Sequence, residues 1–117
     1  MSKRRSILIV EDEPLIAMML EDYVLSLGHA VSGNCDTVPS ALEAVGTGAF
    51  DLAILDVNLK GDLVWPVASA LKEKGVPFII ATGGHVDAPP VEFADAPIIE
   101  KPYTIDRVSP VIAEALG

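Results

Sequence analysis

The sequence predicts an α/β domain in which helices cover both faces of a five-stranded parallel sheet. Two observations predict this class. Four short apolar runs lack polar alternation, as expected for strands buried on both faces. Segments with the three- and four-residue spacing of amphipathic helices lie between them. Because alternating strands and helices are joined by right-handed crossovers, the strands should run parallel.

The strand predictions follow the apolar runs in order. The second strand is the weakest, since its alternation and its glycine indicate a less buried edge position. The predicted strands are 7–10, 30–34, 52–55, 78–81 and 97–99.

The helix predictions rest on spacing and on residues typical of helix ends. For the first helix, Pro14 suits the first turn and Gly28 the end, and Thr37 is a candidate cap for a second helix over 39–45. A third helix should run from near Asp62 to Gly75, and the last helix should follow Thr104. The residues expected to face inward are Ile16, Met19, Leu20, Tyr23, Val24 and Leu27; Val38, Ala41, Leu42 and Val45; Val64, Val67, Ala68 and Leu71; and Ile105, Val108, Ile112 and Ala115 or Leu116.

The stretch between Ala81 and Pro97 differs from the other connections. Its Gly83-Gly84 and Pro89-Pro90 pairs leave room for barely one or two helical turns. We therefore expect the fourth helix to be short or irregular.

Size and charge narrow the function. The 117 residues fit one domain over 1–117, and the net charge of −9 disfavours nucleic acid and anionic membranes as partners. The basic cluster 3–5 is best interpreted as a solvated lead-in to the first strand. With no apolar run approaching the roughly 18 residues of a membrane helix, no signal-peptide pattern and a single cysteine, Cys35, we expect a cytoplasmic protein.

Polar residues follow four of the predicted strands directly. They are Glu11 and Asp12, Asp56, Thr82 and Lys101. The carboxyl ends of parallel strands share one edge of a sheet, where such sheets bind their ligands. These side chains should therefore converge on one pocket.

Three carboxylates held together repel one another unless a positive charge lies among them. Mg²⁺ prefers oxygen ligands and is often shared between carboxylates and a phosphate. With Mg²⁺ on one side and Lys101 on the other, a phosphoryl group on Asp56 would be neutralised from two directions. Asp56 is thus the candidate nucleophile and Mg²⁺ the candidate cofactor.

Four motifs in this order resemble the receiver domain of two-component response regulators over essentially the whole chain. The resemblance implies a flavodoxin-like fold with strand order 2-1-3-4-5 and a chain that is no enzyme beyond its own phosphorylation and slow dephosphorylation. The motifs are Ile7-Leu8-Ile9-Val10-Glu11-Asp12-Glu13, Leu55-Asp56-Val57-Asn58-Leu59, Ala81-Thr82-Gly83-Gly84 and Glu100-Lys101-Pro102-Tyr103.

The same resemblance implies the site roles. Asp56 is the phosphoacceptor, Glu11 and Asp12 form the acidic pair at the metal, and the backbone carbonyl of Asn58 completes the Mg²⁺ site. Thr82 would turn its hydroxyl toward the phosphoryl group, and Lys101 would pair with it. The Lys101-Pro102 bond is expected to be cis, and Tyr103 is expected to pack rather than react.

Two features narrow the resemblance. The run from Pro77 to His85 is similar to the motif of an atypical, often single-domain subgroup common in alphaproteobacteria, with Ile80 in place of the motif's Phe. Ile98 stands where typical receivers have an aromatic switch residue. The switch would then run through the Gly- and Pro-rich segment 83–90.

The expected phosphoryl donor is a histidine kinase or a phosphotransfer protein. Output would be binding to an unknown downstream protein, by a monomer or a phosphorylation-dependent dimer, or the chain would act as a phosphate sink. One alternative is a phosphorylation-independent binding module. Another is a haloacid-dehalogenase-like phosphohydrolase, which would need a second aspartate where Asn58 stands.

Overall fold

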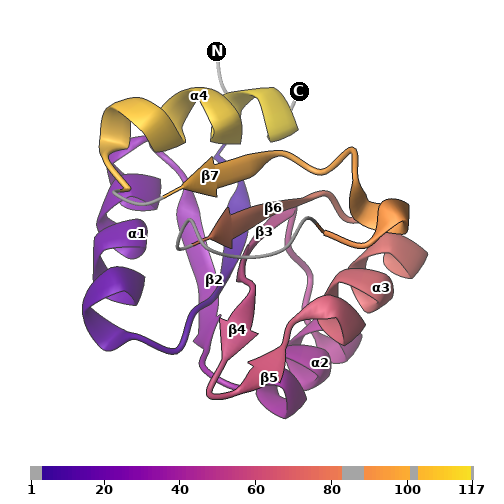
Figure 1. The fold of residues 1–117 in the computed structure, drawn as a ribbon. Coiled ribbons are helices and arrows are strands. Elements are labelled where there is room, and N and C mark those ends of the chain that lie inside the picture. The colour runs from indigo at the N-terminus through magenta and orange to yellow at the C-terminus, as the bar shows by residue number, and fades with distance from the viewer. Residues whose placement is uncertain (1–3, 83–88, 101–102, 117) are drawn as a thin grey trace.

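The computed structural model describes residues 4–82, 89–100 and 103–116 of the chain (Figure 1). The strands are β1 (Ser6–Val10), β2 (Ala30–Cys35), β3 (Leu52–Asp56), β4 (Asn58–Leu59), β5 (Asp62–Leu63), β6 (Phe78–Thr82) and β7 (Ile98–Glu100). The helices are α1 (Pro14–Ser26), α2 (Val38–Thr47), α3 (Trp65–Lys74) and α4 (Ile105–Leu116), with a short 3₁₀ turn, η1 (Val91–Phe93).

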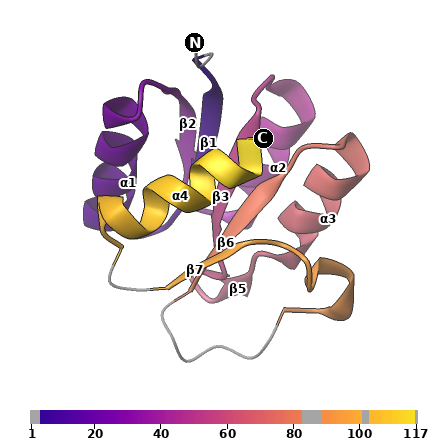
Figure 2. The ribbon, with the colours of Figure 1, turned by 90° about the horizontal axis from the view of Figure 1, so that it is seen from above.

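The main sheet has the order β2-β1-β3-β6-β7, and its neighbouring strands are all parallel. This is the predicted order 2-1-3-4-5, because β6 and β7 are the fourth and fifth strands of the main sheet. Helices α1 and α4 cover one face and α2 and α3 the other, as both views show (Figures 1 and 2). The predicted flavodoxin-like fold is confirmed.

Each face of the sheet has its own apolar core, because the side chains of a strand alternate between the two faces. Ile7 and Ile9 of β1 point to the α1 and α4 side, whereas Leu8 and Val10 point to the α2 and α3 side. All four are fully buried, as expected for a central strand.

The strand register brings the carboxyl ends of β1, β3 and β6 to nearly the same level. Val10 lies opposite Leu55 of β3, and Asp56 lies opposite Ala81 of β6. The residues that follow Val10 and Ala81 therefore lie on either side of Asp56.

A small hairpin between β3 and α3 was not predicted. Strands β4 and β5 pair in antiparallel fashion around a two-residue turn, in which Lys60 and Gly61 have φ of 51° and 90°. Two positive φ values are typical of the tightest hairpin turns. Because the hairpin uses Asp62 and Leu63, α3 begins at Trp65, and the predicted start at Asp62 is wrong.

Most of the predicted inward faces are confirmed, but Leu42 and Ile105 are exposed. The buried stripe of α2 runs through Ala41 and Val45, and Leu42 lies about 100° around the helix from Ala41. Ile105 is the first residue of α4 and lies before the first buried residue of that helix, Val108.

The ends of α2 and α3 are fixed by specific contacts. Thr37 caps α2 as predicted, and it forms a reciprocal capping box with Ser40. At the other end, the Lys74 ammonium donates hydrogen bonds to the carbonyl oxygens of Val45 and Gly48, the latter at 3.0 Å. Lys74 therefore ties the end of α3 to the end of α2.

The connection between β6 and β7 contains one 3₁₀ turn, η1, in its described part (89–97). This agrees with the expected short or irregular fourth helix, while residues 83–88 of the predicted switch segment lie outside the described residues. Throughout the described ranges, every helix is too short or too polar to cross a membrane.

Candidate functional site

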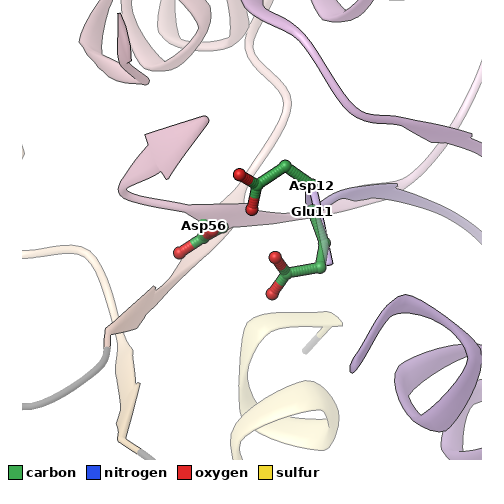
Figure 3. A group of neighbouring side chains, drawn as sticks. All are labelled: Glu11, Asp12 and Asp56. Carbon is green, nitrogen blue, oxygen red and sulfur yellow. The ribbon is translucent and has the colours of Figure 1, made fainter. Parts of the chain in front are cut away.

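Three carboxylates meet at the carboxyl ends of β1 and β3. Glu11 and Asp12 follow β1 directly, and Asp56 is the last residue of β3 (Figure 3). One carboxylate oxygen from each side chain lies within 4.8 Å of the others. The predicted convergence of these residues is therefore present.

Glu11 is the buried member of this acid cluster, with only 4% of its surface exposed. Burial is the main cause that raises the pKa of its carboxyl to about 8, and the nearby Asp56 charge adds to it. The backbone N–H of Glu13 donates to Glu11 at 3.1 Å and acts in the opposite sense without outweighing them. Glu11 therefore tends to hold a proton near neutral pH.

Asp12 has the opposite character. Burial by itself would raise the pKa of its carboxyl, but hydrogen bonding with the Lys60 N–H and with the neighbouring Glu11 and Asp56 carboxyl groups outweighs it, so the pKa lies below the usual value. The Lys60 bond comes from the backbone N–H, at 3.0 Å from Asp12 Oδ2. The cluster thus has one carboxyl that favours the proton and one that favours the charge.

A divalent cation fits this arrangement. Three carboxylates offer the hard oxygen ligands that Mg²⁺ prefers, and a cation among them would offset the Asp56 charge that adds to the effect of burial on the Glu11 pKa. Glu11, Asp12 and Asp56 would hold the ion. Bound Mg²⁺ would offset the negative charge that the three carboxylates share.

The other predicted site residues differ in how well they are placed. Thr82 ends β6 and is buried, beside the strand that ends in Asp56. Asn58 lies in the β4–β5 hairpin, where its side-chain oxygen accepts a hydrogen bond from the Gly61 N–H at 3.0 Å. Lys101 and Pro102, with the expected cis bond, lie outside the described residues.

Two contacts at the site were missed from the sequence. One is the Lys60 N–H on Asp12, which no side-chain pattern could reveal because the donor is the backbone. The other involves Tyr103, whose hydroxyl donates to the Thr82 carbonyl at 3.2 Å. Tyr103 packs in the core as predicted, but a buried phenol also needs a hydrogen-bond partner, and that was the available signal.

Residues 7–111 match the response regulator receiver domain family, and the chain belongs to this family. It is 37% identical to the phyllosphere-induced regulator PhyR of Methylorubrum extorquens over 119 residues, which cover 94% of this chain and 43% of PhyR. The chain therefore spans less than half the length of this curated relative.

Two solved structures are closely similar. The solution structure of SdrG from Sphingomonas melonis Fr1 is 49% identical, with a TM-score of 0.87 and full coverage of both chains. The BeF3-activated conformation of SdrG from Pseudomonas melonis Fr1 is 50% identical, with a TM-score of 0.82 and 96% coverage of both chains.

The family assignment confirms the predicted receiver domain and agrees with the predicted subgroup. Receiver domains belong to two-component phosphorelay signalling. The chain is therefore a signalling protein rather than an enzyme, as predicted.

Proposed function

We propose that residues 1–117 form a receiver domain that accepts a phosphoryl group on Asp56 in an Mg²⁺-dependent reaction. The observation that carries the proposal is the convergence of Glu11, Asp12 and Asp56 at one edge of the sheet. Membership of the receiver domain family also supports the proposal, and this support comes from the sequence match rather than from the geometry of the carboxylates. Lys101 and Thr82 are proposed to pair with the phosphoryl oxygens, and the Asn58 carbonyl to complete the metal site.

The proposed step is a phosphoryl transfer between two nucleophiles. A carboxylate oxygen of Asp56 forms a bond to phosphorus as the bond from phosphorus to the donor's histidine nitrogen breaks, and that nitrogen keeps the electron pair. Asp56 must be ionised for this attack. Glu11 and Asp12 contribute by holding the cation that offsets the added negative charge.

We propose a histidine kinase or a phosphotransfer protein as the donor. A surface on α1 supports a protein donor: Leu15, Met18 and Leu25 lie on one side of the helix and are exposed, Leu15 by 79%. This stripe starts directly after the loop that carries Glu11 and Asp12. Exposed apolar side chains that lie together are typical of protein contacts.

Two further points remain predictions. Output would pass to a downstream protein through a change in the segment 83–90, which backbone relaxation with and without phosphorylation would test. We also propose the cytoplasm as the compartment, which is consistent with the free, buried Cys35.

The test is phosphorylation with acetyl phosphate and Mg²⁺, followed by intact mass, with Trp65 fluorescence as a second readout for beryllofluoride binding. Wild type should gain one phosphoryl group, and Asp56→Asn should gain none. Asp62→Asn is the matched control, because Asp62 is an exposed aspartate in β5, outside the acid cluster. A wild type that gained no phosphate with any donor would instead support a phosphorylation-independent binding module.

A further inference from the structure

Tyr103 links two elements that are far apart in the sequence. Its side chain reaches the end of β6, where the hydroxyl donates to the Thr82 carbonyl at 3.2 Å. Its own carbonyl accepts a hydrogen bond from the Tyr23 hydroxyl of α1 at 2.8 Å. The main chain at residue 103 is thus anchored to α1, while the side chain is anchored to β6.

The environment of Tyr103 keeps its hydroxyl a donor. The residue is 3% exposed, so that its hydroxyl cannot exchange this partner for bulk water. Burial raises the pKa of the phenol, and the charges of Asp56 and Glu11 add to that rise. The contribution of the two carboxylate charges indicates that the phenol lies near the acid cluster.

The position that carries an aromatic switch residue in typical receivers does not provide an aromatic contact to Thr82 in this chain. Ile98 is 42% exposed on β7, and its register partner is Ile80 rather than Thr82. Tyr103, by contrast, is an aromatic residue in direct contact with Thr82 from the connection between β7 and α4.

We propose that Tyr103 is a positioning residue for Thr82: by holding the Thr82 carbonyl, it fixes the main chain at the end of β6 so that the Thr82 hydroxyl can meet a phosphoryl group on Asp56. This inference rests on the proposed phosphorylation of Asp56. It adds a residue that acts through Thr82 and does not itself touch the phosphoryl group.

The physical basis is preorganisation. A threonine side chain has few rotamers, so the direction of its hydroxyl depends on where its backbone lies. Thr82 is the last residue of its strand, and its register partner is Glu100, the last residue of β7. A hydrogen bond to the Thr82 carbonyl restrains the backbone at this point, and a restrained group binds with a smaller loss of entropy.

The test is a double-mutant cycle of Tyr103→Phe and Thr82→Ala in the full chain, with the affinity for beryllofluoride in Mg²⁺ read from Trp65 fluorescence. Tyr103→Phe keeps the ring and removes only the hydroxyl, so affinity should fall about fivefold, the usual effect of one hydrogen bond. In the Thr82→Ala background the same substitution should change affinity less than about twofold, since no hydroxyl remains to be positioned.

Tyr23→Phe is the matched control, because it removes the other hydrogen bond of Tyr103 but leaves the contact with Thr82. Its affinity should stay within about twofold of wild type. Equal losses in Tyr23→Phe and Tyr103→Phe, or an equal loss from Tyr103→Phe with and without Thr82, would reduce Tyr103 to general packing and overturn the inference. A wild type that neither binds beryllofluoride nor gains phosphate would overturn the proposed function as well.

Discussion

The two faces of the sheet are covered by helix pairs of similar size, yet the contacts made on the two faces differ in kind. On the α2 and α3 face, the core includes ring contacts: Trp65 stacks on Phe93 with centroids 5.8 Å apart, and Phe78 meets the same ring edge to face. On the α1 and α4 face, Tyr23 and Tyr103 form hydrogen bonds that lead to Thr82.

This difference suggests that one face of the sheet mainly supports stability and that the other also takes part in the response at the site. The packed rings of Phe78 and Phe93 carry no hydrogen-bond donor or acceptor that could respond directly to charge at the site. Hydrogen bonds that end beside Asp56 do have such groups. We therefore expect changes in the core of the α2 and α3 face to alter stability alone, and changes to the Tyr103–Thr82 contact on the other face to alter the response to phosphorylation.

The largest expected effect comes from Leu71→Ala on the α2 and α3 face. Leu71 is fully buried, and its truncation should lower the free energy of unfolding by about 3 kcal/mol, through lost burial and the cavity left behind. Urea unfolding measures this, and Leu25→Ala on the exposed side of α1 is the control. A tenfold change in beryllofluoride affinity at a temperature where the variant stays folded would contradict the proposed division.

Glu11 gives the next largest effect. Its pKa of about 8 in the folded protein lies above the ordinary value of 4.5, so the folded state keeps a proton that the unfolded chain releases. Stability should therefore fall as the pH rises from about 4.5 to about 8. Glu11→Gln cannot ionise and should be more stable than wild type by roughly 1 to 3 kcal/mol above that range.

Urea unfolding of both proteins below and above this pH range, without Mg²⁺, measures the effect. Added Mg²⁺ should stabilise wild type at the high pH, by about 2.7 kcal/mol at a hundredfold excess over its dissociation constant. Glu11→Gln should gain less. Parallel pH profiles for the two proteins would show that Glu11 is not the group that holds the extra proton.

Lys74→Met tests the contact between α2 and α3. It removes the hydrogen bonds from the ammonium to the carbonyls of Val45 and Gly48, and we expect a loss of about 1 kcal/mol with no change in beryllofluoride affinity. Lys74→Arg should recover part of the stability. Thermal unfolding of the three proteins provides the measurement, and an unchanged melting temperature in Lys74→Met would count against the contact.

The smallest effect is expected for Lys60→Gly in the β4–β5 hairpin. The variant loses an exposed ion pair with Asp36, which stabilises by at most about 1 kcal/mol, but it relieves the positive φ of 51°. The two should nearly cancel, and Mg²⁺ affinity should be unchanged because the backbone N–H on Asp12 remains. Isothermal titration calorimetry of Mg²⁺ binding to wild type and Lys60→Gly provides the measurement, and a much weaker affinity in the variant would show that the side chain of Lys60 supports the site.

Much of the fold could be predicted because it depends on patterns that the sequence displays. The buried runs around Ile9, Ile54 and Ile79 predict central strands, and the polar residues that end them predict the edge where the site lies. Exact helix starts were harder to predict. The Lys60-Gly61 turn has a short local signal that does not outweigh the helical spacing after it, so α3 was predicted to begin too early.

The acid cluster could be predicted for the same reason as the strands. The contacts that restrain the acid cluster could not be predicted, because they depend on the backbone N–H of Lys60 and the backbone carbonyl of Thr82. Nearly every residue of any chain has these two groups, so the sequence does not single them out. Only the folded geometry determines which of them lies beside Asp12 or under Tyr103.

The hydrogen bond from the Lys60 backbone N–H to Asp12 also makes position 60 suitable for a spectroscopic label. Because the backbone makes this contact, the exposed side chain at position 60 can be exchanged without removing it. Lys60→Cys would place a reactive thiol next to the acid cluster, while the native Cys35 is buried and its thiol pKa is raised by that burial. A spin label or fluorophore at position 60 would then report on metal entry from a few residues away.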